Sequence, residues 1–202
     1  MKVSALIPTY CRTERLQKCL EALENQTRVA DEVVIVVRNC DSETPKFLDC
    51  FNSEVFQLNI VTVTIAGQIA ALNAGFNAAQ GGIIAITDND AVPHTGWLKR
   101  IEAHFLADEN VGGVGGRDWI CHGEQLEDGK RCSVIGRVHW FGRVTGNHHL
   151  GCDAPREVKI LKGANMSYRK AAIEQALDRL ICDRVLLNTL RQNAYATAQN
   201  YS

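Results

Sequence analysis

Residues 82–90, GIIAITDND, run from a glycine through a short apolar stretch into an acidic triplet. The β-branched residues and the length of the stretch are typical of a buried strand over residues 83–87. Two carboxylates, Asp88 and Asp90, therefore follow a strand end, which is where ligands bind in open α/β sheets. Carboxylate oxygens suit Mg²⁺ or Mn²⁺, but Asp-Asn-Asp before Pro93 is also good turn chemistry. The triplet therefore predicts a cation site or a turn.

The residues before this strand alternate apolar runs with helical patterns, which is typical of an α/β fold. We expect a three-layer α/β/α sandwich with a mainly parallel central sheet. The pattern predicts strands over 3–7, 33–37 and 58–65, and helices over 13–25, from Ser42 or Thr44 to about 51, and over 68–79. Beyond Pro93 it predicts a helix over 96–106, a glycine-rich strand over 111–116, an irregular segment over 117–156, a strand over 158–161 and a helix over 169–190.

The composition is that of an ordinary globular protein. Of 202 residues, 46% are hydrophobic and 22% charged, which argues against intrinsic disorder. The formal net charge of −1 argues against a nucleic-acid partner, which normally requires a basic face. The longest apolar runs are far too short to cross a bilayer, and the N-terminus lacks a secretory signal pattern. We therefore expect a cytoplasmic protein, with peripheral membrane association as an open alternative.

Eight cysteines are scattered without a CxxC pair, which favours free thiols in a reducing compartment. The alternative is a zinc site in the irregular segment, where cysteine and histidine recur at irregular spacing. Its ligands would come from Cys121, His122, Cys132, His148, His149 and Cys152.

Several short motifs occur in an order that closely resembles family-2 glycosyltransferases over about the first 170 residues. They are ALIPTYCR at 5–12, the helix end Asn25-Gln26-Thr27, DEVVIVV at 31–37, ALNAG at 71–75 with Ala78, residues 82–90, and KGANMSYR at 162–169. The resemblance implies a glycosyltransferase A type fold. It also implies transfer of a sugar, with inversion, from a nucleoside-diphosphate sugar, UDP-linked in our reading, to an acceptor hydroxyl. One domain would then span 1–202, with a nucleotide-binding half over 1–90 and an acceptor-side half over 91–202 that is atypical or incomplete.

The resemblance also assigns residues to the donor nucleotide sugar. The loop after the first strand would bind the base and ribose, and Tyr10 or Arg12 can cover a base or reach a phosphate. Asp41 is our choice for the base contact, with helix capping as the alternative. Asp88 is assigned to the ribose and phosphates and Asp90, together with Asp88, to Mn²⁺ or Mg²⁺. The full set of nucleotide-sugar residues is Pro8, Thr9, Tyr10, Arg12, Asp41, Asn73, Asp88 and Asn89.

The general base that an inverting transfer requires is harder to find. Family members usually carry an acidic pair beyond the segment matching 165–169, but downstream of Met166 the only acids are Glu174, Asp178 and Asp183, in a predicted helix. Asp118 is the candidate base, and its neighbour Trp119 can stack on a sugar. An ordinary surface pairing of Arg117 with Asp118 is the alternative.

Two adjacent histidines, His148 and His149, are candidates for contact with the metal or the acceptor. The acceptor would be a saccharide or a lipid-linked molecule, as in cell-surface polysaccharide assembly. Two other functions stay open. One is a nucleotide-sugar-binding module without turnover, and the other is a nucleotidyltransferase, although Pro8 to Arg12 lacks the glycine-rich basic loop that such an enzyme needs.

Overall fold

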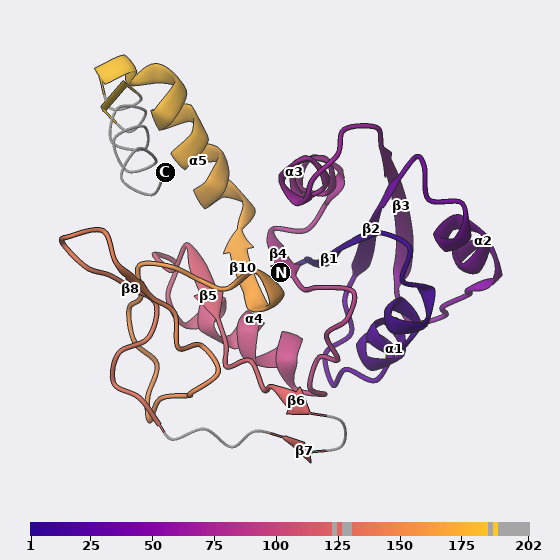
Figure 1. Cartoon of the computed structure of the whole chain (residues 1–202), viewed down its shortest axis with the longest axis horizontal. Helices are drawn as coiled ribbons and strands as arrows, with labels where there is room; N and C mark the ends of the chain where they lie inside the picture. Colours follow the sequence, from indigo (N-terminus) through magenta and orange to yellow (C-terminus); the bar gives the residue numbers. More distant parts are fainter. Residues whose placement is uncertain (123–124, 127–130, 186–187, 190–202) are drawn as a thin grey trace.

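A six-stranded sheet between helices organises the chain (Figure 1). The computed structural model describes residues 1–122, 125–126, 131–185 and 188–189. In the first half the elements are β1 (Val3–Thr9), α1 (Thr13–Glu24), β2 (Glu32–Arg38), α2 (Glu43–Cys50), β3 (Gln57–Val63), α3 (Gln68–Ala78) and β4 (Ile83–Ile86). They are followed by α4 (Trp97–Ala107), β5 (Gly113–Gly115), β6 (Cys121–His122), β7 (Gln125–Leu126), β8 (Arg137–Val138), β9 (Val144–Thr145), the 3-10 turn η1 (Gly163–Asn165), β10 (Met166–Arg169) and α5 (Lys170–Cys182).

The strand order is β3-β2-β1-β4-β10-β5. The first four strands run parallel, with Leu6 of β1 opposite Val34 of β2 and Ile86 of β4. β10 runs antiparallel to both of its neighbours, β4 and β5. The apolar runs predict these parallel strands because a strand covered on both faces needs no polar alternation. The predicted fold class, a mainly parallel α/β sheet, is confirmed.

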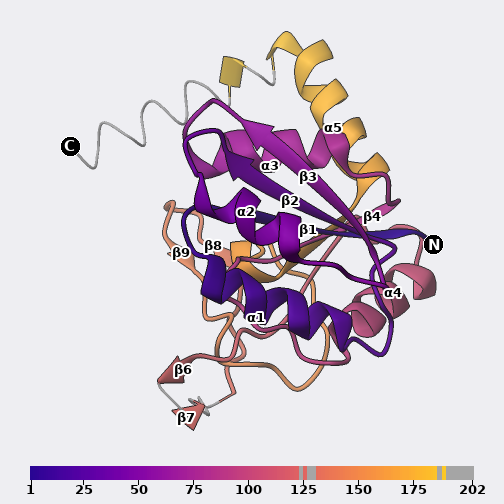
Figure 2. The same ribbon diagram turned by 90° about the vertical axis from the view of Figure 1, so that its right-hand side faces the viewer.

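Helices cover both faces of the sheet, so the predicted three layers are present (Figure 2). On one face α1, α2 and α4 bury Leu20, Leu48 and Phe105 in one cluster with residues of β1, β2 and β4. On the other face α3 packs Ala71 against Leu6 and Val36. The helix approaches so closely at Gly75 that a Cβ there would lie 2.2 Å from the Leu6 Cδ1 atom. Small residues on α3 therefore set the distance between helix and sheet.

The prediction of a strand over residues 158–161 is wrong. The backbone N–H groups of Lys159 and Ile160 donate to the Gly136 carbonyl at 2.8 and 3.2 Å instead of joining the sheet. The strand next to β4 is instead β10, whose Ser167 lies opposite Ala85. Sequence periodicity alone does not distinguish a loop that contains apolar residues from a short strand that mixes polar and apolar residues.

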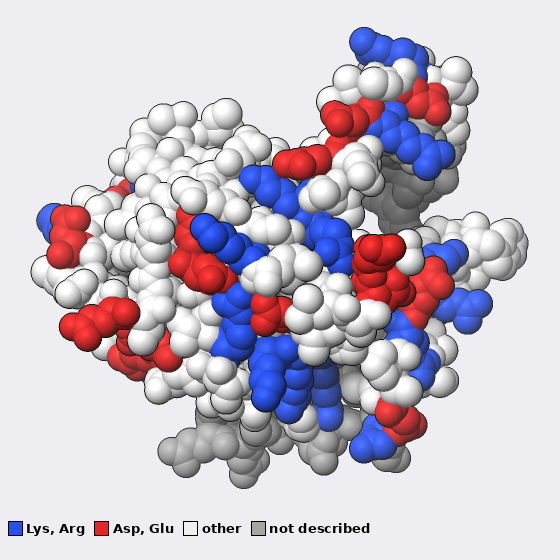
Figure 3. Space-filling view, turned by 180° about the vertical axis from the view of Figure 1, so that it is seen from behind, with Lys and Arg blue, Asp and Glu red and all other residues white. Residues whose placement is uncertain are grey.

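Charges of both signs intermix on the face of the molecule seen from behind (Figure 3). Among the described residues, no helix combines the length and the apolar character needed to cross a bilayer.

Candidate nucleotide-sugar site

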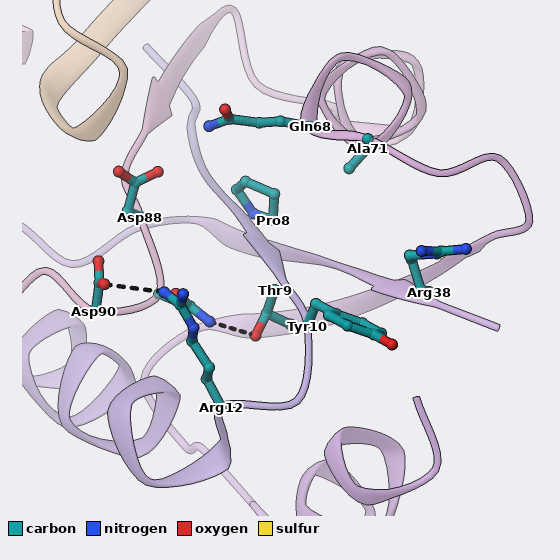
Figure 4. A pocket seen from close by; sticks show the side chains of 11 residues that line it. Pro8, Thr9, Tyr10, Arg12, Arg38, Gln68, Ala71, Asp88 and Asp90 are labelled. Carbon is teal, nitrogen blue, oxygen red and sulfur yellow. Dashed lines mark hydrogen bonds and ion pairs between the residues drawn. The ribbon is translucent and has the colours of Figure 1, made fainter. Parts of the chain in front are cut away.

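A cavity of about 450 Å³ opens at the carboxyl ends of β1 and β4 (Figure 4). The loop after β1, the first turn of α3, the end of β2 and the acidic triplet surround it. Its lining residues are Pro8, Thr9, Tyr10, Arg12, Arg38, Gly67, Gln68, Ala71, Asp88, Asn89 and Asp90. This is the edge at which open α/β sheets bind ligands.

The opening exists because β4 ends before its neighbour β1. The last backbone hydrogen bond between them runs from the Thr87 N–H to the Leu6 carbonyl at 3.1 Å. Pro8 lies two residues further along β1, so its backbone also faces the β4 side. A proline has no N–H to donate, so no backbone N–H is left unpaired where the two strands part. Pro8 therefore suits the floor of a crevice between strands.

Asp90 is held by two guanidinium groups. Its Oδ2 atom lies 3.1 Å from Nη1 of Arg12 and 3.1 Å from Nη1 of Arg15. Both arginines come from the start of α1, three residues apart, and therefore project from the same side of the helix. In Figure 4 the Arg12 side chain reaches from below toward Asp90. Positive and negative groups thus face each other at the mouth of the cavity.

Asp88 lies in an environment that opposes its charge. Burial, and then the charges of Asp90 and Asp118, raise the pKa of Asp88 above its ordinary value. Lys162 and Arg12 act in the opposite direction without cancelling the effect. Positive charge beside Asp88 would relieve this repulsion, so its surroundings favour a cation.

Asp118, from the acceptor-side half of the chain, adds a third carboxylate, whose charge acts on Asp88. Only 12% of its side chain is exposed, and its Oδ2 lies 3.0 Å from the Lys162 Nζ. Next to it, the Arg117 guanidinium stacks over the Trp119 ring at 3.7 Å, which leaves about half of Trp119 exposed. Asp118, Trp119 and Lys162 thus lie near one another beside the acidic triplet. The surface pairing weighed for Arg117 and Asp118 is not the contact observed, because Asp118 pairs with Lys162.

The other cavity residues support its shape. The Asn89 side-chain amide donates to Thr9 Oγ1 at 2.8 Å, and both side chains are buried, so this bond ties the triplet to β1. Across the cavity from Asp88, the Arg38 guanidinium lies 5.5 Å from the Tyr10 ring centre. This leaves half of Tyr10 exposed at the cavity edge, where a planar ligand can stack.

Asp41 does not line the cavity. Its carboxylate accepts hydrogen bonds from the backbone N–H groups of Glu43 and Thr44 and from Thr44 Oγ1, so its helix-capping role is confirmed. It also accepts a 2.6 Å bond from the Cys11 N–H. Burial alone would raise the pKa of Asp41, but these hydrogen bonds outweigh it and lower the pKa below its ordinary value. Its contact with a base stays a prediction.

Three other predicted residues lie away from the cavity lining. Asn73 is exposed on α3. His148 is buried, and its Nε2 donates to the Ile160 carbonyl at 3.2 Å. The backbone carbonyl of His149 accepts from Arg117 Nε at 2.9 Å. The two histidines thus hold the irregular segment against the residues around Asp118.

Other site residues were missed from the sequence. Gly67, Gln68 and Ala71 line the cavity because α3 begins above it, and Gly67 has a φ of +108° that favours glycine. Arg15 and Lys162 pair with two of the carboxylates. A basic residue three positions after Arg12 on a predicted helix was a usable signal for Arg15. Gln68 and Lys162 reach the site because distant segments of the chain meet there, and no pattern in the neighbouring sequence indicates it.

The donor atoms fit a hard divalent cation. Asp88 and Asp90 offer carboxylate oxygens, and Mg²⁺ is usually bound by one or two carboxylates together with ligand phosphates and water. Among the described residues, no three His, Cys, Asp or Glu side chains form a ready-made metal group. The zinc alternative thus finds no support in those residues, and the side chain of His122 lies outside them.

Comparison with known proteins agrees with this geometry. The family model described as Glycosyl transferase family 2 matches residues 4–177. Glycosyltransferase AglE of Haloferax volcanii is 35% identical over 101 residues, which are 48% of this chain and 33% of AglE. YwdF, an uncharacterized glycosyltransferase of Bacillus subtilis, is 32% identical over 93 residues, 45% of this chain and 33% of YwdF. The matches span about a third of these relatives.

Solved structures share the fold. The mannosyltransferase PcManGT from Pyrobaculum calidifontis, in complex with GDP-Man and Mn²⁺, superimposes with a TM-score of 0.61 at 20% identity, covering 87% of this chain and 46% of that chain. S. aureus TarS 1–349 in complex with UDP-GlcNAc gives a TM-score of 0.59 at 17% identity, covering 87% and 47%. At such identities the likeness shows the fold alone, and it confirms the predicted glycosyltransferase A type. Since the family model spans most of the chain, the protein belongs to glycosyl transferase family 2.

Proposed function

We propose that this protein transfers a sugar from a nucleoside-diphosphate sugar, UDP-linked, to an acceptor hydroxyl with inversion, in a reaction that depends on Mn²⁺ or Mg²⁺. The observation that carries the proposal is a cavity lined by Asp88, Asp90 and Arg12, with Tyr10 at its edge and the charge of Asp118 acting on Asp88. The solved relatives that bind GDP-Man with Mn²⁺ and UDP-GlcNAc support a nucleotide-sugar donor. The acceptor is a saccharide or a lipid-linked molecule, reached from a peripheral position at the cytoplasmic face of a membrane.

The donor lies across the cavity with its base toward Tyr10 and its phosphates toward the arginines. Tyr10 offers a ring face at the cavity edge, next to Arg38. Arg12 offers a guanidinium group whose planar donors match phosphate oxygens. In this assignment residues 1–90 hold the nucleotide and residues 91–202 face the acceptor.

Asp90 and Asp88 hold the divalent cation together with the donor phosphates. A cation bound there stabilises the charge that develops on the leaving diphosphate. Burial raises the pKa of Asp88 first and the charge of Asp90 adds to it, and a cation bound between the two carboxylates would remove the second effect.

Asp118 is the base that takes the proton from the acceptor hydroxyl, and Trp119 stacks on the acceptor sugar. Asp118 is the carboxylate beyond the triplet whose charge raises the pKa of Asp88, after burial and Asp90, and it comes from the acceptor-side half. Lys162 orients its carboxylate through the 3.0 Å ion pair. The same ion pair favours the second candidate, a binding module without turnover, because an Asp118 oxygen held by Lys162 is less free to accept a proton.

Calorimetric titration with UDP, GDP and CDP, each with and without Mn²⁺, tests the binding half of the proposal. We expect UDP to bind most tightly of the three, and much more weakly without the metal. A donor-hydrolysis assay with UDP-glucose, UDP-GlcNAc and GDP-mannose then separates the two candidates, because the module binds without releasing UDP.

The variants Asp90→Asn and Asp118→Asn sharpen the test. Asp90→Asn should lose metal-dependent binding, whereas Asp118→Asn should bind UDP normally and turn over at least about 100-fold more slowly. Asp178→Asn, on an exposed position of α5, is the matched control. Normal turnover by Asp118→Asn would exclude its role as base.

A further inference from the structure

The β8–β9 hairpin ends in an aromatic tip that the body of the protein does not cover. The hairpin pairs Val138 with Val144, and the His139 N–H donates to the Arg143 carbonyl at 2.8 Å to close the turn. Trp140 is 96% exposed and Phe141 57% exposed. The two rings pack edge to face on each other at 5.4 Å. Figure 1 shows the hairpin region reaching away from the sheet.

The hairpin is held firmly at its base. Gly136 has a φ of +56°, and a Cβ there would lie 2.6 Å from the Ile160 carbonyl oxygen, so the backbone must pass close to residues 158–160. The Gly136 N–H donates to the Gly146 carbonyl at 2.9 Å. An aromatic pair at the end of an anchored hairpin is presented outward.

The hairpin and the residues around its base are rich in basic side chains. Between residues 131 and 160 there are five Lys or Arg residues and two Asp or Glu residues, in a chain whose net charge is −1. One of the two acids, Asp153, is paired with Arg131. Arg137 and Arg143, on the two sides of the turn, are exposed and form no ion pair with any described residue. The charges of Arg137 and Arg143 are therefore not neutralised by an ion pair within the described part of the chain.

A second cavity lies at the base of the hairpin. It has a volume of about 390 Å³, and its charged lining consists of Arg137, Arg156, Lys159 and Glu157. Three cations against one anion favour a small anionic group there, such as a phosphate.

We propose that the β8–β9 tip docks on the surface of an anionic lipid bilayer, with Trp140 and Phe141 in the interfacial layer and the surrounding basic residues on lipid phosphates. Amphipathic aromatic rings concentrate at the headgroup level, and Lys or Arg next to them bind anionic lipids. A protein partner fits less well, because two aromatic side chains offer roughly 300–500 Å², short of the ~800 Å² per partner of a stable interface.

We expect docking in this way to bring the candidate active site to the bilayer side of the molecule. The hairpin continues into residues 147–149, where the His148 carbonyl accepts from the Asp118 N–H at 3.1 Å. The orientation rests on the proposed function, since it places Asp118 where a lipid-linked acceptor would arrive. Binding to lipid itself does not require catalysis, so the two proposals can fail separately.

Sedimentation with vesicles tests the proposal. We expect the protein to bind vesicles of phosphatidylcholine mixed with phosphatidylglycerol, to bind phosphatidylcholine alone weakly, and to be released by salt. The double variant Trp140→Ala/Phe141→Ala should bind the anionic vesicles at least about tenfold more weakly. The double variant Arg137→Ala/Arg143→Ala should lose about 30-fold, about fivefold per arginine, and most of the salt dependence.

The controls separate docking from misfolding and from self-association. Leu106→Ala removes an equally exposed apolar side chain from α4 and should leave vesicle binding unchanged. Trp140→Phe should keep binding but lose the quenching of tryptophan fluorescence by brominated lipid. Calorimetry with UDP, without vesicles, reports separately on the nucleotide site.

The proposal is overturned if wild-type protein does not sediment with anionic vesicles, or if either double variant binds them like wild type. It is equally overturned if the tip variants convert a dimer into a monomer without affecting vesicle binding, since the tip would then bind a second copy of the chain.

Discussion

Asp88 carries a charge that the fold makes unfavourable. Because its pKa in the folded protein is raised, ionisation costs stability once the pH rises past that pKa, and the cost disappears below its ordinary pKa of 3.8. We expect Asp88→Asn to stabilise the protein near pH 7 by about 0.5 kcal/mol, a small gain because water screens a half-exposed carboxylate.

Urea unfolding at several pH values measures this gain, which should shrink as the pH falls toward about 4. Asp178→Asn is again the control and should change little at either pH. A destabilised Asp88→Asn protein would show that Asp88 is held by attractive contacts instead.

Asp41 is the opposite case, a carboxylate that the fold stabilises. Its lowered pKa means that its contribution is present above 3.8 and is lost as the pH falls through the folded-state value. Replacing it by alanine removes the cap of α2 and the bond to the Cys11 N–H, so we expect Asp41→Ala to lose about 2 kcal/mol in chemical denaturation. Ser42→Ala should lose less than about 0.5 kcal/mol, because Ser42 makes no side-chain capping bond. Equal losses in the two variants would contradict this account.

At the level of single residues, local chemistry made part of the site predictable. Asp88 and Asp90 follow an apolar run, and a strand end is visible in a sequence. Asp41 shows the limit, because a capping aspartate and a ligand-binding aspartate look alike until the backbone N–H groups around them are placed. Lys162 shows a second limit of prediction from the sequence, since no residue near it in the chain indicates its ion pair with Asp118.

Among the elements, α3 depends most on the size of its side chains. Gly75→Ala would gain helix propensity, about 1 kcal/mol, but its Cβ would lie 2.2 Å from Leu6 and 2.8 Å from Val36 side-chain atoms. We expect a net loss of about 1–3 kcal/mol in thermal or urea unfolding. Asn77→Ala, on the exposed side of the same helix, should instead be neutral or slightly stabilising. A stabilised Gly75→Ala protein would mean that α3 can move away from the sheet.

The elements also show why the sequence predicted one half of the fold better than the other. The parallel strands β1, β2 and β4 are continuous apolar runs with little ambiguity. β10, with the sequence MSYR, has no such run and is a strand only because β4 and β5 supply partners on both sides. Its place in the sheet depends on β4 and β5, which are distant in the sequence, and the periodicity of residues 166–169 does not reveal these partners.

For the whole molecule, the proposed ligand should act as a clamp, since the cavity joins parts of β1, β2, α3 and the triplet. A ligand at 100 times its Kd stabilises the folded state by about 2.7 kcal/mol. For a chain of this size we expect UDP with Mn²⁺ to raise the melting temperature by roughly 5–10 °C. Differential scanning calorimetry measures the shift. Asp90→Asn should show no increment from Mn²⁺ beyond that of UDP alone, and an unchanged increment would remove Asp90 from the metal site.

In the proposed function, the ion pairs of Arg12 and Arg15 with Asp90 couple the binding of the cation to that of the diphosphate. A divalent cation that takes Asp90 frees two guanidinium groups, and a diphosphate that takes the guanidinium groups frees Asp90. Each ligand, when bound, therefore frees the groups that bind the other, and thermodynamic linkage requires the effect to be mutual. We expect Mn²⁺ to tighten UDP binding by the same factor as UDP tightens Mn²⁺ binding, as measured by two calorimetric titrations. Arg15→Ala should reduce that factor and strengthen the binding of Mn²⁺ alone. With Arg15 in place, we expect each ligand to bind weakly until the other is present.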